Sequence, residues 1–141
     1  MKYIGIEHKV EPKFLYFRTE ATDADDDGTG DSALFPASSL MGMQPTADTS
    51  LTLYFKSMLR GSGNEGAGDA LANLDNNDSV TVTISANTHL TAMQAIITAI
   101  VNPASKPILI VANDDSDGTE YLSGSGISAC GTISVAVAYA N

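Results

Sequence analysis

The chain has 141 residues, 43% of them hydrophobic, which is enough for one core and about one domain over residues 1–141. Its formal net charge is −10, with seven Lys and Arg against 17 Asp and Glu. This balance argues against a surface for nucleic-acid phosphates or anionic lipid, and it favours solubility and cation binding.

Cysteine content and apolar runs bound the location of the protein. The single cysteine, Cys130, excludes an intramolecular disulfide and is expected to be a small buried side chain. The first residues lack the apolar core of a signal peptide, and no apolar run approaches the roughly 20 residues that span a bilayer. We expect no membrane association, and by elimination a cytosolic or virion-type soluble protein.

The first half of the chain combines strand signals with an acidic loop. Residues 14–19 are aromatic-rich and typical of a strand. Residues 23–31, DADDDGTGD, crowd five carboxylates together, which requires a solvated loop or a bound cation. Residues 33–43 resume the apolar pattern, although Pro and Gly interrupt it, so they predict one bent or edge strand. Residues 44–50 then predict a turn.

Two later segments alternate with the period of a half-buried strand. Residues 51–56 and 80–84 each place their large apolar side chains on one face, and we expect the following to point inward: Leu51, Leu53, Phe55, Val80, Val82 and Ile84. The Gly-, Asn- and Asp-rich residues 60–78 between them are too long for a hairpin turn and are expected to form a flexible insertion loop.

Residues 89–101 predict the one confident helix. Asn87 or Thr88 is placed to cap its start, and Pro103 follows its end. Its apolar residues recur at helical spacing, and we expect a buried stripe made of Leu90, Met93, Ile97 and Ile100.

The last third returns to strands. Residues 108–112, ILIVA, are typical of a strand buried on both faces, and an Asp-rich turn over 113–118 follows them. Residues 132–139 alternate again, and one face would carry only the small side chains of Ser134, Ala136 and Ala138. Such a face suits close contact with another surface.

One helix among about six strands indicates an α+β fold that is mostly β. We expect a small, strongly bent antiparallel sheet or a barrel of the Sm or SH3 type, with the helix packed across it. A flat sheet with the helix on one face is the alternative.

The two acidic turns invite comparison with a calcium loop. Carboxylates fall at the odd offsets that calcium loops use, but Leu34 stands where the bidentate Glu of an EF-hand is required. Solvated turns explain the same composition. The candidate metal ligands are Asp23, Asp25, Asp27, Asp31, Asp115 and Asp117, with calcium as the possible ion.

No arrangement of a nucleophile and a base is visible. His89 stands in the first helical turn and reads as a polar residue at a helix start. No cysteine-hydrolase signature surrounds Cys130. We therefore expect no catalytic residues, no cofactor apart from the possible calcium, and no enzymatic activity.

The succession of segments resembles a group of small uncharacterised proteins of marine cyanobacterial tailed phages, also seen in ocean metagenomes. The segments that carry the resemblance are FLYFRT, the acidic loop, SALFPASSLMGM, LTLYFKS, SVTVTIS and HLTAMQAIITAI. The resemblance implies a phage structural or accessory protein, such as a capsid decoration or tail accessory subunit.

We expect such a protein to act by self-association, as a homo-oligomer or with other virion proteins. Two alternatives stay open at this stage. One is a small-barrel module that binds peptide or nucleic acid, although the charge opposes nucleic acid. The other is a calcium-binding domain.

Overall fold

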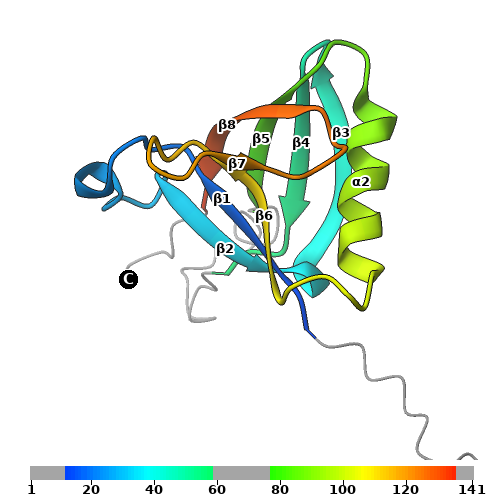
Figure 1. The fold of residues 1–141 in the computed structure, drawn as a ribbon, viewed down its shortest axis with the longest axis horizontal. Helices are drawn as coiled ribbons and strands as arrows, with labels where there is room; N and C mark the ends of the chain where they lie inside the picture. The colour runs from blue at the N-terminus through cyan, green and yellow to red at the C-terminus, as the bar shows by residue number, and fades with distance from the viewer. Residues whose placement is uncertain (1–11, 59–76, 136–141) are drawn as a thin grey trace, which may run out of the picture.

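The computed structural model describes residues 12–58 and 77–135, and the statements below refer to these residues. Figure 1 shows its strands and its helix. The elements in chain order are β1 (Phe14–Arg18), η1 (Asp23–Asp25), β2 (Ser32–Pro36), η2 (Ala37–Ser39), β3 (Leu40–Ala47), β4 (Ser50–Phe55), β5 (Asp78–Ile84), α2 (His89–Val101), β6 (Ile108–Asn113), β7 (Glu120–Tyr121) and β8 (Ile127–Ser134).

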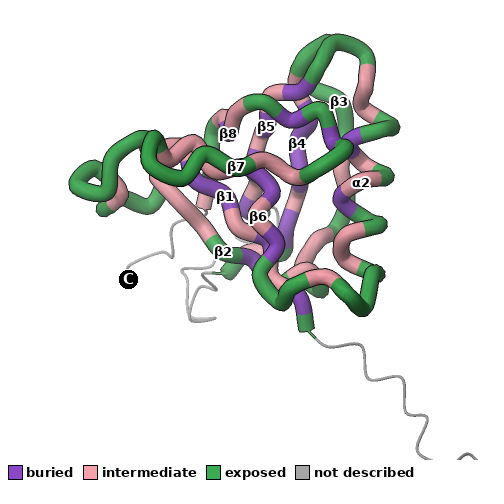
Figure 2. The backbone as a smooth tube through the Cα atoms, in the orientation of Figure 1, coloured by how far each residue is buried: buried purple, intermediate pink, exposed green. Residues whose placement is uncertain are grey.

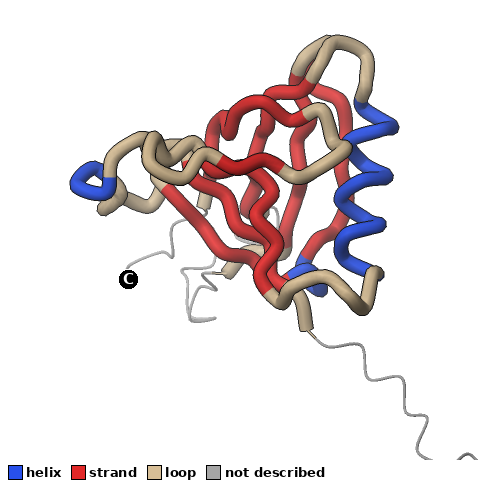
Figure 3. The backbone as a smooth tube through the Cα atoms, viewed as in Figure 1, coloured by secondary structure: helices blue, strands red, loops and turns tan. Residues whose placement is uncertain are grey.

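The strands form two four-stranded sheets, with the orders β2-β1-β6-β7 and β3-β4-β5-β8. The β1–β6 pair is parallel, and the other described strand pairs are antiparallel. The expected α+β fold that is mostly β and mostly antiparallel is therefore confirmed. No closed barrel is found among the described residues, whose strands form two four-stranded sheets (Figure 3).

Aromatic side chains join the two sheets. Phe17 of β1 and Phe35 of β2 belong to one sheet, Phe55 of β4 belongs to the other, and all three are fully buried. The rings of Phe35 and Phe55 stack with centroids 4.1 Å apart, and Phe17 meets each of them edge-on at about 6 Å. These contacts show that one face of β1 packs against the opposite sheet, which buries part of the aromatic-rich segment of residues 14–19.

The alternation predicted for residues 51–56 and 80–84 is confirmed, because all six expected side chains are buried. The opposite face is not simply solvated. Thr52 is only 5% exposed, and its hydroxyl lies 3.1 Å from that of Thr46 and 2.9 Å from that of Thr81. The strand alternation alone predicts that these hydroxyls are solvated. Instead, threonine hydroxyls of β3, β4 and β5 form hydrogen bonds with one another across the strands.

The segment predicted as one bent strand is two strands. β2 ends at Pro36, a short 3-10 turn follows, and β3 begins at Leu40 in the other sheet. β3 also continues through Ala47, so the predicted turn over residues 44–50 contracts to the two residues before β4. The predicted break between strands, at residue 44, lies later in the chain than the observed break after Pro36. A proline at an edge strand can end the strand as well as bend it.

Helix α2 has the predicted bounds but a different buried face. Ala92 and Ile96 are fully buried, with Met93, Ala99 and Ile100 packed partly against the core. Leu90 is 66% exposed and Ile97 45% exposed, so these two members of the expected stripe are wrong, whereas Met93 and Ile100 do pack against the core. Three polar residues, Thr91, Gln94 and Thr98, are exposed on one side of the helix. The expected stripe is displaced because exposed apolar residues border this polar side. The small side chain of Ala92 suits the close approach to the sheets.

The expected helix cap also differs. Thr88 occupies the N-cap position, but its hydroxyl donates to the backbone carbonyl of Ser85 at 2.7 Å rather than capping a helical N–H. Asn87 adopts a positive φ of 60° in the preceding turn, a conformation that Asn tolerates. The helix ends at Asn102 as predicted, one residue before Pro103.

Two predictions concern residues outside the described part of the chain. Most of the predicted insertion loop, residues 60–76, lies there, and β5 already begins at Asp78. Of the predicted small-residue face, only Ser134 is described, whereas Ala136 and Ala138 are not.

Candidate functional site

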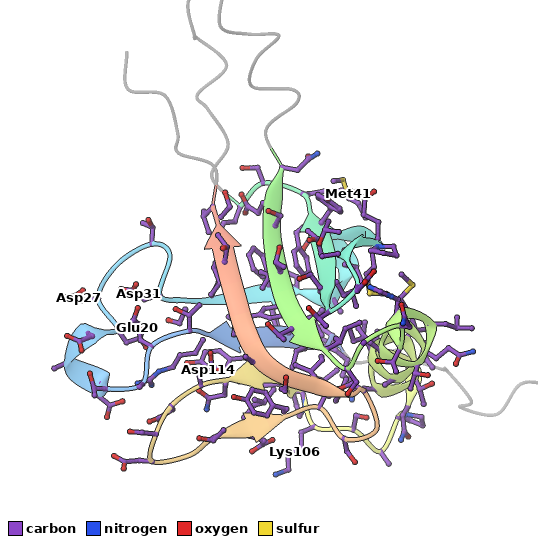
Figure 4. All side chains as sticks on the ribbon, turned by 90° about the horizontal axis from the view of Figure 1, so that it is seen from above. Glu20, Asp27, Asp31, Met41, Lys106 and Asp114 are labelled. Carbon is purple, nitrogen blue, oxygen red and sulfur yellow. The ribbon has the colours of Figure 1, made fainter. Side chains whose placement is uncertain are left out.

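The two acidic turns lie side by side at one edge of the β1–β6 sheet. Because β1 and β6 run parallel, the turns that follow them leave the sheet at the same edge. Arg18 pairs with Asn113 at the end of the parallel register, and the N–H of Asp114 donates to the carbonyl of Arg18. Ser116 then donates both its N–H and its hydroxyl to the carbonyl of Ala21. We call turns 23–31 and 113–118 the acidic edge (Figure 4).

Arg18 supplies a positive charge between these turns. Its side chain is 8% exposed, and its guanidinium lies 3.0 Å from a carboxylate oxygen of Asp23 in the first turn. It also lies 3.7 Å from Asp26 and 3.5 Å from Asp115, which belongs to the second turn. Its Nε donates to the carbonyl of Glu20 at 2.8 Å. One side chain therefore ties both turns to the end of β1.

The surroundings raise the pKa of Arg18 above its ordinary value, mainly through the hydrogen bond to Asp23 and further through the charge of Asp115. Burial acts in the opposite direction. The guanidinium thus stays charged and balances part of the negative charge that the carboxylates would otherwise direct at one another.

The six carboxylates named as candidate metal ligands are placed in different ways. Asp23 and Asp115 share Arg18. Asp25 accepts the hydroxyl of Thr22 at 2.6 Å, and Asp31 accepts the N–H groups of Asp27 and Gly28. The exposed Asp117 donates its N–H to Asp115.

Within residues 12–58 and 77–135, no three Asp, Glu, His or Cys side chains form a group that fits a metal ion. The contacts just described are typical of Asx-type turns, and Arg18 holds the two turns together. Calcium binding at the acidic edge stays a hypothesis, with Asp23, Asp25, Asp27, Asp31, Asp115 and Asp117 as its candidate ligands.

Asp114 has a structural role at the edge that sequence reasoning missed. One of its carboxylate oxygens accepts the hydroxyl of Tyr121 at 2.6 Å, and both oxygens lie 3.1 Å from the backbone nitrogen of Cys130. Its side chain therefore links β7 of one sheet to β8 of the other. In the sequence it is one Asp among several, and the only available signal was its place directly after a buried strand.

Asp114 and burial together keep two neighbouring groups protonated. Burial raises the pKa of Tyr121 to about 12, helped by the hydrogen bond to Asp114. Burial likewise raises the pKa of Cys130 to about 12, with the charge of Asp114 as the second cause. Cys130 is 7% exposed, as expected for a small core residue. A thiol with so high a pKa is a poor nucleophile at neutral pH.

His89 has a structural role in the described contacts. Its Nε2 lies 2.8 Å from the carbonyl oxygen of Ala47 and 3.1 Å from that of Ser50. Because both partners are acceptors, Nε2 must carry a proton and donate. The histidine thus fastens the start of α2 to the turn between β3 and β4.

The outer face of α2 combines exposed apolar side chains with the exposed polar side chains of Thr91, Gln94 and Thr98. Leu90 is 66%, Ile97 45% and Val101 68% exposed. Apart from His89, the helix carries no charged or titratable side chain over its thirteen residues. Figures 1 and 2 show this exposed face at the end of the molecule opposite the acidic edge. We call Leu90, Ile97 and Val101 the α2 stripe.

Comparison with known proteins identifies no family. No family model, no curated protein and no solved structure matches the chain. Within the described residues, no helix has the length and apolar character needed to cross a membrane.

Proposed function

We propose that the chain is a non-enzymatic structural or accessory subunit of a tailed-phage particle, such as a capsid decoration or tail accessory subunit, and that it acts by self-association. The α2 stripe is the single observation that carries the self-association. The resemblance to small phage proteins supports the setting.

The three side chains of the α2 stripe are exposed and available for contact with a partner. Leu90 and Val101 are each about two-thirds exposed and lie at opposite ends of the same helix, with Ile97 between them. Single exposed apolar residues are common on protein surfaces, but an aligned row of them on an uncharged helix marks an interaction site.

The distribution of charge favours this face over the acidic edge for contact between two copies. Two chains that each carry a formal charge of −10 repel one another. The repulsion is smallest when the acidic edges point away from each other, and it is screened beyond roughly 8 Å at physiological ionic strength. Contact through α2 satisfies this condition, because the acidic edge lies at the opposite end of the molecule (Figure 1).

The sheet edges are less suited to self-association. Edge strand β3 contains Pro45 and two register irregularities, and β7 has only two residues. On β8, the carboxylate of Asp114 occupies the N–H of Cys130. Prolines, bulges and covered N–H groups are the devices that prevent edge-to-edge pairing. Association through the helix is therefore favoured over strand addition at β3, β7 or β8.

The expected pairwise contact is weak. Burying the exposed parts of three apolar side chains on each of two copies contributes about 6 kcal/mol. Association costs at least about 4 kcal/mol in lost translational and rotational freedom. A single contact of this size gives a concentration-dependent pair, and repeated contacts in a particle lattice strengthen it through effective concentration. Such weak, multiplied contacts suit a subunit that joins an existing shell.

Light scattering across a concentration series tests the proposal. We expect the average mass to rise above that of one chain toward millimolar concentration. The substitution Ile97→Glu should return the mass to that of one chain, because it places a charge in the stripe. Leu34→Glu is the matched control, because Leu34 on β2 is 43% exposed, close to the 45% of Ile97, and lies on another surface.

Two results together would overturn the proposal. One is a mass equal to one chain at every concentration. The other is absence of the protein from purified particles of the phage that encodes it, as measured by mass spectrometry. The alternative of a Sm- or SH3-type module for peptide or nucleic acid has less support, because the described strands form two open sheets and the net charge is negative.

A further inference from the structure

We infer that the two acidic turns cover the free side of strand β8 and protect it from pairing with another chain, with Asp114 as the residue that binds its backbone. β8 spans eight residues at the end of its sheet, so only one side of it is paired with a described strand, β5. An uncovered edge strand is a template for pairing with a second chain. Such protection is separate from the proposed contact through α2.

The second turn covers the backbone N–H of Cys130. This residue stands opposite Val82 in the pairing of β8 with β5. Both carboxylate oxygens of Asp114 lie 3.1 Å from the Cys130 nitrogen, so this N–H points away from β5 and toward the turn that follows β6. The same carboxylate accepts the hydroxyl of Tyr121. Asp114 thus binds the N–H group to which a neighbouring strand would offer a carbonyl.

The first turn lies against β8 three residues further along the strand. A Cβ placed on Gly30 would lie 3.5 Å from the backbone carbonyl oxygen of Ile133, at ordinary van der Waals distance. Figure 4 shows both turns on the side of β8 that faces away from β5. The two turns therefore flank the free side of β8 from Cys130 to Ile133.

Arg18 holds this cover in place. Its backbone carbonyl accepts the N–H of Asp114 at 3.1 Å. Its guanidinium lies 3.5 Å from Asp115 in the second turn and 3.0 Å from Asp23 in the first. The end of β1 therefore positions the Asp114 backbone directly, and it ties the two turns to each other above β8.

The charge of the cover adds a second barrier to pairing. The two turns carry eight Asp residues, five in 23–31 and three in 113–118. A strand of a second copy, which also has a formal charge of −10, would have to lie against these carboxylates. Charged side chains and covering loops are both devices that natural sheets use at their edges. Protection of β8 is therefore a reason for carboxylates at this place.

Aggregation kinetics of variants test the cover. We expect Asp114→Ala to form thioflavin-T-positive assemblies at least about tenfold faster than the wild type, because the β8 N–H is then free to pair. Each protein is incubated at the same interval below its own melting temperature, which makes the unfolded fractions comparable. Ile96→Ala, in the buried face of α2, is the matched control, because it weakens the core without touching β8 and should cause no such acceleration.

A charge placed on β8 shows whether this strand is the one that pairs. Thr132 is exposed on β8, and a lysine on an edge strand opposes strand addition. Adding Thr132→Lys to Asp114→Ala should return the aggregation rate to that of the wild type. Aggregation of Asp114→Ala no faster than that of Ile96→Ala would overturn the inference. Acceleration that Thr132→Lys does not reduce would also overturn it, because another segment would then be pairing.

Asp114→Asn covers the case in which Asp114→Ala does not fold. The amide keeps the shape of the side chain but cannot offer two charged oxygens to the Cys130 N–H. We expect hydrogen exchange of the Cys130 amide to become at least about tenfold faster, with the amide of Val82, on the inner strand β5, unchanged. Equal exchange of the Cys130 amide in the wild type and the variant would show that Asp114 does not protect β8.

Discussion

The guanidinium of Arg18, at the end of β1, lies 3.5 Å from the carboxylate of Asp115, in the turn that follows β6. The two residues meet because β1 and β6 are parallel neighbours, so the turns after them share one edge of the sheet. Arg18 thus places one positive charge between the two acidic turns, each of which the sequence offered as a possible calcium loop.

Replacing Arg18 by methionine should lower the melting temperature by several degrees and change the response to salt. Without the guanidinium, Asp23, Asp26 and Asp115 are left with uncompensated repulsion, which added NaCl screens. We therefore expect salt to stabilise the variant more than the wild type in thermal melts. Lys56→Met, at an exposed position, removes the same charge and should show neither effect. Identical salt responses of the wild type and Arg18→Met would contradict the role of Arg18.

Replacing Asp114 by alanine should lower the free energy of unfolding by about 2–4 kcal/mol, because the Tyr121 hydroxyl and the Cys130 N–H lose a charged acceptor. Asp117→Ala, at an exposed position of the same turn, should change it by less than about 0.5 kcal/mol. Urea unfolding monitored by circular dichroism measures both values. Equal effects of the two substitutions would show that Asp114 does not join the sheets.

Replacing Gly131 by alanine should destabilise the protein by roughly 1–3 kcal/mol through overpacking. A Cβ at this position would lie 2.6 Å from the backbone carbonyl oxygen of Thr81, which cannot move without shifting β5. Gly42→Ala is the matched control, because a Cβ there meets nothing within 4 Å, and we expect a change within about 0.5 kcal/mol. Thermal melts of the two variants decide the point, and a tolerated alanine at 131 would refute the close strand contact.

Alkaline pH should weaken the fold between about pH 9 and pH 12. The pKa of Tyr121 rises from 10.0, and that of Cys130 from 9.0, to about 12 in the folded protein. Because both folded pKa values exceed the unfolded ones, these groups contribute stability that is fully present below pH 9 and is lost as the pH rises through the folded values. The comparison is the urea midpoint of the wild type and of a Tyr121→Phe, Cys130→Ala double variant at several pH values. A wild type that loses no more stability than the variant would argue against the shifts.

Millimolar calcium should shift the melting temperature of the wild type by less than about one degree, compared with NaCl of equal ionic strength. The reason is that Arg18 already contacts Asp23 and Asp115, two of the candidate ligands. A ligand that binds the folded state stabilises it in proportion to the logarithm of its concentration above Kd. A saturable shift of several degrees with calcium, but not with NaCl, would instead support a calcium site at the acidic edge.

Local pattern in the sequence determined much of the secondary structure. The alternation in residues 51–56 and 80–84 fixed which side chains of β4 and β5 are buried, because side chains of a strand point to opposite faces in turn. The bounds of α2 followed from its continuous helix-forming residues and from Pro103. These features depend on neighbours a few residues apart, and a single sequence contains that information.

Only the tertiary structure decided which surfaces meet. It placed β2 and β3 in different sheets, buried Ala92 and Ile96 instead of Leu90 and Ile97, and brought Arg18 to Asp115. The apolar residues of α2 cover more of the helix surface than its core contacts use, and an acidic turn carries no sign of its partner. The choice among these depends on contacts between residues distant in the chain, above all the parallel pairing of β1 with β6, which local propensity does not encode.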